Sequence, residues 1–299
     1  IRPLVRKQVS NLTQQAPKYF AVPASTEDED IQAANIAEAI LDAHYREDHY
    51  KQELQLCVWW GSICGSGFLK TYWDSKVKDS AGNTGKFVTE NISPFYIYVP
   101  NLLTKNIEHE PYVIHAATMS VEEVKQRFGV TCQPNVNASL SILEDQFLSL
   151  VGVTRDRPHN ECLVCEYWIK PGKFSLFPNG GFLRTAGDQF ISFDEGWPYD
   201  HGQYPFSKFD DVESGRFYGE AFINDVVPIQ REYNRTRSQI IEAKNLMAKP
   251  KLVAQRGSIN PHQITSGPGQ VILYTPGMQP PAPLQLPSIP TYVETEVER

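Results

Sequence analysis

The spacing of apolar residues near the start of the chain predicts one long amphipathic helix. Apolar side chains recur every three or four positions, at Ala33, Ile36, Ile40, Ala43, Tyr50, Leu54 and Cys57. This is the spacing of one helix face. Thr26 and the acids that follow it favour a helix start, because acids stabilise the positive end of the helix dipole. The glycines at 61–67 are expected to end the helix. Nine acids and two bases between residues 26 and 56 make its other face anionic.

Runs of aromatic and β-branched residues then predict a β-rich region. A strand over Phe68–Trp73, turn residues at 79–85 and a returning strand over Lys86–Ile92 have the form of a hairpin. Further strands are expected at Phe95–Val99, at Tyr112–Ala117 and, as two or three strands, between Glu161 and Ser192. The segment Glu195–Gly215, rich in glycine, proline and aromatics, is expected to be a loop.

Shorter helices are predicted around these strands. Residues 1–15 have the pattern of a helix end, and Leu140–Leu150 is a further candidate. The clearest case is Val121–Phe128, because Ser120 and Glu123 form a capping box and a glycine follows the last apolar position.

The segment Gly219–Ala248 carries the strongest helical pattern in the chain. Its apolar residues follow one another at spacings of four and three, at Phe222, Val226, Ile229, Tyr233, Thr236, Ile240, Ala243 and Met247. That spacing is typical of a helix packed lengthwise against a neighbour. Arg231, Arg235, Ser238 and Glu242 lie on the opposite side. Pro228 is expected either to begin the straight helix or to kink it.

The residues after this helix predict little regular structure. Two short strands are expected, over Lys249–Gln255 and Gln270–Tyr274. Pro276–Pro290 holds six prolines in fifteen residues, which favours an extended backbone with few hydrogen bonds. The pattern at Thr291–Arg299 indicates the start of another helix.

Composition and charge narrow the class of protein. The chain has 299 residues with 41% apolar and 21% charged residues, which is typical of a folded protein of about two domains. No apolar run is long enough to cross a membrane. The net charge of −7 excludes a wholly basic nucleic-acid-binding protein. Residues 216–256 nevertheless hold eight bases and four acids. On charge alone this indicates either a solvated helix face or contact with a polyanion in this region only. Because the chain begins at Ile1, we interpret it as an internal segment of a longer protein.

The sequence lacks the usual patterns of an active site. Five cysteines in a chain of this length argue against a disulfide framework. Cys162 and Cys165 have no second Cys-x-x-Cys to complete a zinc site, and a buried strand explains them better. The glycine-rich stretches at 61–67 and 82–86 fit neither a nucleophile elbow nor a phosphate-binding loop. We therefore predict a protein that is not an enzyme and has no cofactor, no catalytic residue and no metal site.

The basic helix and the segments around it resemble the portal proteins of tailed bacteriophages, especially short-tailed ones. The helix reads Asp225-x-x-Pro228-Ile229-Gln230-Arg231-Glu232-x-Asn234, then Arg237-Ser238-x-Ile240, Asn245 and Lys249-Pro250-Lys251. Earlier segments that resemble the family are Gly65-x-Gly67-Phe68-Leu69-Lys70-x-x-Trp73-Asp74, Ser93-Pro94-Phe95-x-x-Tyr98-x-x-Pro100 and the helix that ends in Arg127-Phe128-Gly129.

The resemblance implies an α+β portal fold with a mixed α/β wing, a long stem helix and a small β-containing clip. Residues 1–215 would form the wing, 216–249 the first stem helix and 250–287 the clip. Residues 288–299 would begin the second stem helix, and the tunnel loop and crown are absent from this sequence. Portal subunits assemble as a ring at one capsid vertex, here expected to be a dodecamer.

The resemblance also implies partners and residue roles. The ring is the channel for packaging and ejecting double-stranded DNA, and it docks the terminase large subunit and then the tail adaptor proteins. Its other partners would be further copies of the chain and the major capsid protein, with no membrane. It would be assembled in the host cytoplasm and reside in the virion. The expected channel-facing residues are Arg231, Arg235, Ser238 and Glu242, and the expected motor- or adaptor-facing residues are Lys251, Arg256, His262 and Gln263.

Two functions of other classes remain open on the sequence alone. The loop at 194–211 combines rings with carboxylates, as glycan-active enzymes do. Its rings are Trp197, Tyr199, Tyr204 and Phe206, and its acids are Asp194, Glu195, Asp200, Asp210 and Asp211. The other possibility is a different virion component, a scaffold or adaptor, which would assemble without a channel wide enough for DNA.

Overall fold

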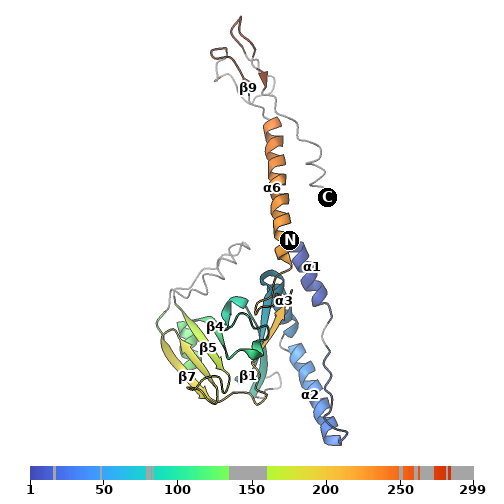
Figure 1. Cartoon of the computed structure of the whole chain (residues 1–299), viewed down its shortest axis with the longest axis vertical. Coiled ribbons are helices and arrows are strands. Elements are labelled where there is room, and N and C mark those ends of the chain that lie inside the picture. The colour runs from blue at the N-terminus through green and yellow to red at the C-terminus, as the bar shows by residue number, and fades with distance from the viewer. Residues whose placement is uncertain are drawn as a thin grey trace. The chain divides into compact units, whose positions relative to one another are not determined.

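Five α-helices and two antiparallel sheets of three and five strands make up the part of the chain that the structure, a computed structural model, describes (Figure 1). These residues are 1–15, 18–47, 49–78, 82, 84–134, 160–248, 252–258, 262, 273–280 and 282–283. The predicted α+β class is therefore confirmed. The chain divides into two compact units, Ile1–Asn224 and Asp225–Arg299.

The first unit begins with three helices, α1 (Arg2–Leu12), α2 (Asp28–Glu47) and α3 (Tyr50–Cys64). The single long helix predicted over this region is wrong, because the chain breaks between α2 and α3. His49 has a φ of 53°, in the left-handed region, and a residue in that conformation cannot continue a right-handed helix. His44, near the end of α2, lies 2.9 Å from the Thr89 hydroxyl and so ties that end to a strand.

Glycines turn the end of α3 directly into strand β1 (Ser66–Lys78). Gly65 ends the helix with a φ of 92°, and its position leaves no room for a side chain, because a Cβ there would lie 2.1 Å from the Gly219 carbonyl oxygen. At Gly67 a Cβ would lie 2.1 Å from the Cys57 carbonyl oxygen, since α3 packs closely on the strand. The predicted helix-to-strand turn is therefore confirmed.

The first sheet has the strand order β2-β1-β8, with β2 at Thr84–Ile92 and β8 at Phe206–Asp210. The predicted hairpin of β1 and β2 is confirmed, with Phe68 opposite Ile92. The prediction of a loop over Glu195–Gly215 is wrong, because β8 lies inside it and pairs with β1 from Lys70–Phe206 to Ser66–Asp210. This pairing joins residues far apart in sequence, so local patterning did not reveal it.

The second sheet follows chain order from β3 to β7. Its strands are β3 (Ile97–Tyr98), β4 (Tyr112–Ser120), β5 (Glu161–Ile169), β6 (Gly181–Ala186) and β7 (Gln189–Glu195). The strand predicted at Phe95–Val99 shrinks to two residues, because Pro94–Tyr96 forms a 3-10 turn capped by Ser93. Helix α4 (Val121–Phe128) is confirmed with its cap, since the Glu123 N–H donates to the Ser120 hydroxyl at 3.1 Å.

The main hydrophobic core joins the two sheets. Phe68 and Phe206 from the first sheet pack in one cluster with Val113, Trp168 and Phe182 from the second. A smaller cluster beneath α4 contains Val124, Cys162 and Val164. The strand faces that meet in these clusters also fix which polar side chains are brought together.

The second unit consists of most of helix α6 (Ile223–Ala248) and a short strand pair. The helix starts four residues later than predicted, and Pro228 lies inside it rather than in its first turn, so the backbone hydrogen bond that an N–H there would make is missing. Strand β9 (Leu252–Val253) pairs antiparallel with β10 (Ala282–Pro283). The expected strand at 249–255 is therefore only two residues long, and its partner lies in the proline-rich segment.

Other expectations for this part of the chain lie wholly or partly outside the described residues. The helices predicted at 140–150 and 291–299 fall there entirely. Of the strand expected at 270–274, only Leu273 and Tyr274 are described, and they are not in a strand. The domain boundaries predicted at 215, 249 and 287 stay predictions.

We predict that Gly65→Ala destabilises the first unit much more than Gly129→Ala does. Both glycines end a helix in the left-handed region, but a Cβ at Gly129 would meet nothing within 4 Å. Gly129→Ala should therefore cost only the left-handed strain, about 1 kcal/mol. Gly65→Ala adds a clash with backbone, for a total of roughly 3 kcal/mol or more. Urea unfolding of the two variants measures the difference, and equal losses would contradict the proposed close approach.

Candidate functional site

The residues predicted to face DNA lie on one polar stripe of α6. Arg231, Arg235, Ser238 and Glu242 are all exposed and follow one another at spacings of four, three and four. Residues at these spacings are neighbours on a helix surface. The stripe covers eleven helical steps, or about 16 Å along the axis.

The three charged side chains of this stripe have no charged partner among the described residues. Neither arginine forms an ion pair or a side-chain hydrogen bond there, and neither does Glu242. Ser238 donates to the Asn234 carbonyl at 2.9 Å, which keeps its hydroxyl on the helix. The two guanidinium groups are therefore available to an external anion.

The opposite side of α6 exposes apolar side chains to solvent. Ile229 is 69% exposed, and Tyr233 and Met247 are also exposed, whereas Ile240 is buried. At 3.6 residues per turn these positions lie about half a turn from Arg231 and Arg235. A helix that exposes both an apolar and a charged side has the composition of one that packs against a neighbour along its length.

The predicted motor-facing residues are only partly described. Arg256 is exposed in the turn after β9, and His262 is exposed as well. Lys251 and Gln263 lie outside the described residues. The role predicted for these four residues therefore stays a prediction.

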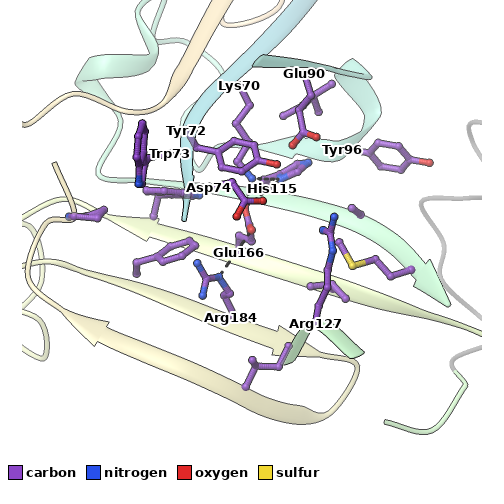
Figure 2. A pocket seen from close by; sticks show the side chains of 18 of the residues that line it. Lys70, Tyr72, Trp73, Asp74, Glu90, Tyr96, His115, Arg127, Glu166 and Arg184 are labelled. Atoms are coloured by element: carbon purple, nitrogen blue, oxygen red, sulfur yellow. Dashed lines mark hydrogen bonds and ion pairs between the residues drawn. The ribbon is translucent and has the colours of Figure 1, made fainter. Parts of the chain in front are cut away.

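The two sheets of the first unit line a cleft of about 1000 Å³. Strands β1 and β2 line it from the first sheet, and β4, β5, β6 and β7 line it from the second. Figure 2 shows its polar side chains, which converge from both sheets. The charged residues and the histidine that line it are Lys70, Asp74, Glu90, His115, Arg127, Glu166, Arg184 and Asp194.

The carboxylate group of Glu166 lies close to three basic side chains that line this cleft. The register of the second sheet places His115 opposite Glu166, and Glu166 opposite Arg184. Lys70 reaches them from β1, with its Nζ 2.6 Å from Glu166 Oε2 and 3.4 Å from His115 Nδ1. Arg184 Nε lies 3.9 Å from the other carboxylate oxygen. Lys70 is only 5% exposed, so its charge requires this partner.

This environment keeps Glu166 ionised far below neutral pH. Burial by itself raises the pKa of the carboxyl group, but the charge of Lys70 and the hydrogen bond and charge of His115 lower it to about 2. An efficient general base has a pKa near the working pH, so this carboxylate is poorly suited to take protons at neutral pH. The arrangement is that of an ion-pair network that links two sheets.

The cleft also contains buried polar atoms that have no partner among the described residues. The Trp168 Nε1 group belongs to a side chain that is 3% exposed, and Ser192 Oγ lies on the neighbouring part of the lining. Trp168 packs against Phe182 and Tyr199, with ring centroids 4.1 and 6.1 Å apart. Its ring faces are therefore covered by protein.

Sequence reasoning missed the ion-pair network, although a clue to it was present. Lys70, His115 and Glu166 each occupy an inward-facing position in a strand whose neighbouring inward positions are largely apolar, such as Phe68, Val113, Val164 and Trp168. A charge at such a position needs a buried partner. Local patterning could have indicated these residues individually, but their pairing depends on how the two sheets meet.

The acids and rings of the loop at 194–211 do not form one site. Asp194 and Tyr199 line the cleft, whereas Trp197, Tyr204 and Phe206 pack on the main core. The remaining acids of this loop lie elsewhere. Asp210 pairs with Lys208 at 2.7 Å, Asp211 accepts the Phe222 N–H at 2.8 Å, Glu195 accepts the Asn179 side chain, and Asp200 is exposed.

The cysteines are free thiols in the described part of the chain. Cys132 and Cys162 lie in the smaller core with their sulfur atoms 2.9 Å apart. Burial and the neighbouring thiol raise the pKa of Cys162 to about 12, so this thiol is protonated and poorly reactive at neutral pH. Among the described residues, no group of three or more His, Cys, Asp or Glu side chains has an arrangement suited to a metal ion.

No protein-family model matches this chain, and no curated protein matches it. In the described residues, no helix combines the length and apolarity needed to span a bilayer.

We predict that Glu166→Gln destabilises the first unit at neutral pH but not in strong acid. The pKa of Glu166 in the folded state, about 2, lies below its usual value of 4.5, so the stabilisation is present above pH 4.5 and is lost as the pH falls toward 2. The shift corresponds to roughly 3 kcal/mol at pH 7. Denaturant unfolding from pH 7 to 2 measures it.

Glu161→Gln is the matched control for this experiment. Glu161 lies on the same strand but forms no ion pair with a described residue, so its replacement should change stability by less than about 0.5 kcal/mol. A loss for Glu166→Gln that stays constant across the pH range would contradict the ion-pair interpretation.

Proposed function

We propose that this chain is part of a portal-type subunit that forms a ring around DNA at one capsid vertex. The observation that carries the proposal is the two-sided surface of α6. One side presents Arg231 and Arg235 without internal partners, and the other presents Ile229, Tyr233 and Met247 to solvent. In a ring of parallel helices, the apolar sides would pack on neighbouring subunits and the polar stripe would face the centre.

The charge distribution suits a channel through which DNA moves. Each phosphate neutralised by a protein charge adds affinity that depends on salt, so a channel with many bases would hold DNA tightly. The chain is acidic overall, with a net charge of −7, and the stripe offers two bases and one acid per subunit. We infer that these few bases guide the duplex while leaving it free to slide.

The strand pair after α6 also supports assembly with neighbours. Strands β9 and β10 have two residues each, and an isolated two-stranded pair is at best marginally stable in water. In the proposal, this region is the clip, and strands of neighbouring subunits extend the pair by edge-to-edge hydrogen bonding.

The remaining roles follow from the ring and are part of the same proposal. The ring, a dodecamer, contacts the major capsid protein, the terminase large subunit and the tail adaptors, and it resides in the virion. The chain itself is a structural component rather than an enzyme, since packaging energy comes from the separate motor. Arg256 and His262 belong to the exposed region that would meet the motor or the adaptors.

We predict that the full-length protein assembles into a closed ring with an open centre. Light scattering gives the mass of the assembly, and electron-microscope class averages show whether a channel wide enough for duplex DNA is present. A monodisperse monomer or dimer would falsify the ring. A closed assembly without a channel would favour a scaffold or adaptor instead.

We further predict that Arg231→Glu with Arg235→Glu weakens the retention of DNA and leaves the ring assembled. The change removes the bases of the polar stripe, so DNA association should become weaker and less dependent on salt. Lys125→Glu with Lys173→Glu is the matched control, because it makes the same charge change at exposed positions of the first unit. DNA retention and packaged genome length, compared between the two variants, measure the effect. Equal effects of the two variants would place the polar stripe away from DNA.

A further inference from the structure

Helix α2 turns its apolar side to solvent. The spacing of Ala33, Ile36, Ile40 and Ala43 predicts one apolar face, and all four residues are exposed in the structure. Ile36 is 60% exposed and Ile40 is 49% exposed. We call these four residues the α2 seam.

The partly buried side of α2 is the more polar one. The half-buried positions are Asp30, Ala34, Glu38, His44 and Tyr45. All of them except His44, which contacts Thr89, follow one another along the side opposite the α2 seam. A helix in a soluble protein normally buries its apolar face, so the reversed arrangement indicates a surface covered by another molecule. Figure 1 shows α2 outside the two sheets.

A groove between α1 and α3 has the features that complement the α2 seam. It encloses about 470 Å³ and includes the apolar side chains of Val9 and Trp59. Its charged residues are Arg6 and Lys51, with no acid among the residues that line it. Neither base forms an ion pair with another described residue.

The net charges of helices α2 and α1 are also opposite in sign. Helix α2 carries six acids and one base, including Asp28, Glu29 and Asp30 in its first turn. Helix α1 carries three bases and no acid. Opposite charges beside an apolar contact steer association and fix its orientation.

We propose that the α2 seam of one copy docks into the α1–α3 groove of a second copy. Because the two surfaces are different parts of the chain, the contact is head-to-tail, and head-to-tail contacts form a ring when the rotation between copies closes. The inference deepens the proposed function, because it names surfaces through which that ring is joined.

The estimated area of the α2 seam explains why a single contact of this kind would be weak outside a ring. A helix of twenty residues is about 30 Å long and about 10 Å wide, so its seam covers on the order of 300 Å². A stable two-protein interface usually covers about 800 Å² per partner. One such contact alone is therefore weak, whereas a closed ring gives every copy two of them in addition to contacts elsewhere.

Disulfide trapping between two differently tagged copies tests the contact directly. One copy carries Ile40→Cys and the other carries Ser10→Cys, which lies in the groove. We expect about tenfold more mixed dimer than with Ile31→Cys, the ratio for a docking preference of about 1.4 kcal/mol. Ile31 is an exposed isoleucine nine residues earlier and half a turn away on the same helix. Equal trapping by Ile31→Cys and Ile40→Cys would overturn the proposal.

Charge exchange provides an independent measurement that distinguishes docking from misfolding. Arg6→Glu with Lys51→Glu should raise the concentration needed for assembly about tenfold, and adding Asp28→Lys with Glu29→Lys should restore it. Restoration in the fourfold variant supports docking, and failure to restore assembly in a variant with native circular dichroism overturns it.

The outcomes separate this inference from the proposed function. If rings with an open centre form but trapping at Ile40 is not selective, the portal proposal is supported and the α2 contact is wrong. If trapping at Ile40 is selective but the protein forms no ring, the α2 contact is supported and the portal proposal is wrong. Trapping only within a single chain that carries Ile40→Cys and Ser10→Cys would mean that α2 covers its own groove, and it would overturn the docking.

Discussion

The placement of the first unit's two sheets depends on the buried charge of Lys70. Its ammonium group projects from β1 and lies within 2.6 Å of a Glu166 oxygen on the other sheet. A buried ammonium group without a partner is strongly unfavourable, so any packing that buries Lys70 away from Glu166 leaves its charge uncompensated. Around this pair, Phe68, Phe206 and Trp168 supply the apolar burial. The apolar contacts provide most of the stability, and the ion pair selects one arrangement among those that would bury similar area.

A second constraint fixes the point where the first unit leads into α6. The left-handed turn at Gly65 brings the backbone against Gly219, and Ser66 Oγ accepts the Gly219 N–H at 2.8 Å. The same hydroxyl donates to Asp210, which also pairs with Lys208. The turn after α3, the end of β8 and the segment around Gly219 are thereby held together within the first unit.

The exposed surfaces have a common character that bears on function. The α2 seam and the apolar side of α6 both leave regularly spaced apolar residues in solvent, and each lies on a helix with strong charge on another side. Such faces are unfavourable for an isolated chain, and in both of our proposals neighbouring copies cover them. Self-assembly is therefore the property on which the portal proposal and the α2 contact both depend.

The sequence by itself determined the elements whose causes are local. The cap at Ser120, the β1–β2 hairpin, the turn at Gly65 and the α+β class follow from periodicity and from residues a few positions apart. The same patterns indicated the polar stripe and the apolar side of α6. Only the tertiary structure decided the break at His49, the pairing of β8 with β1 and the network around Glu166. These depend on contacts between distant residues, because local propensity is weak and the free energy of burying a charge or pairing a strand edge is gained only after the chain has folded.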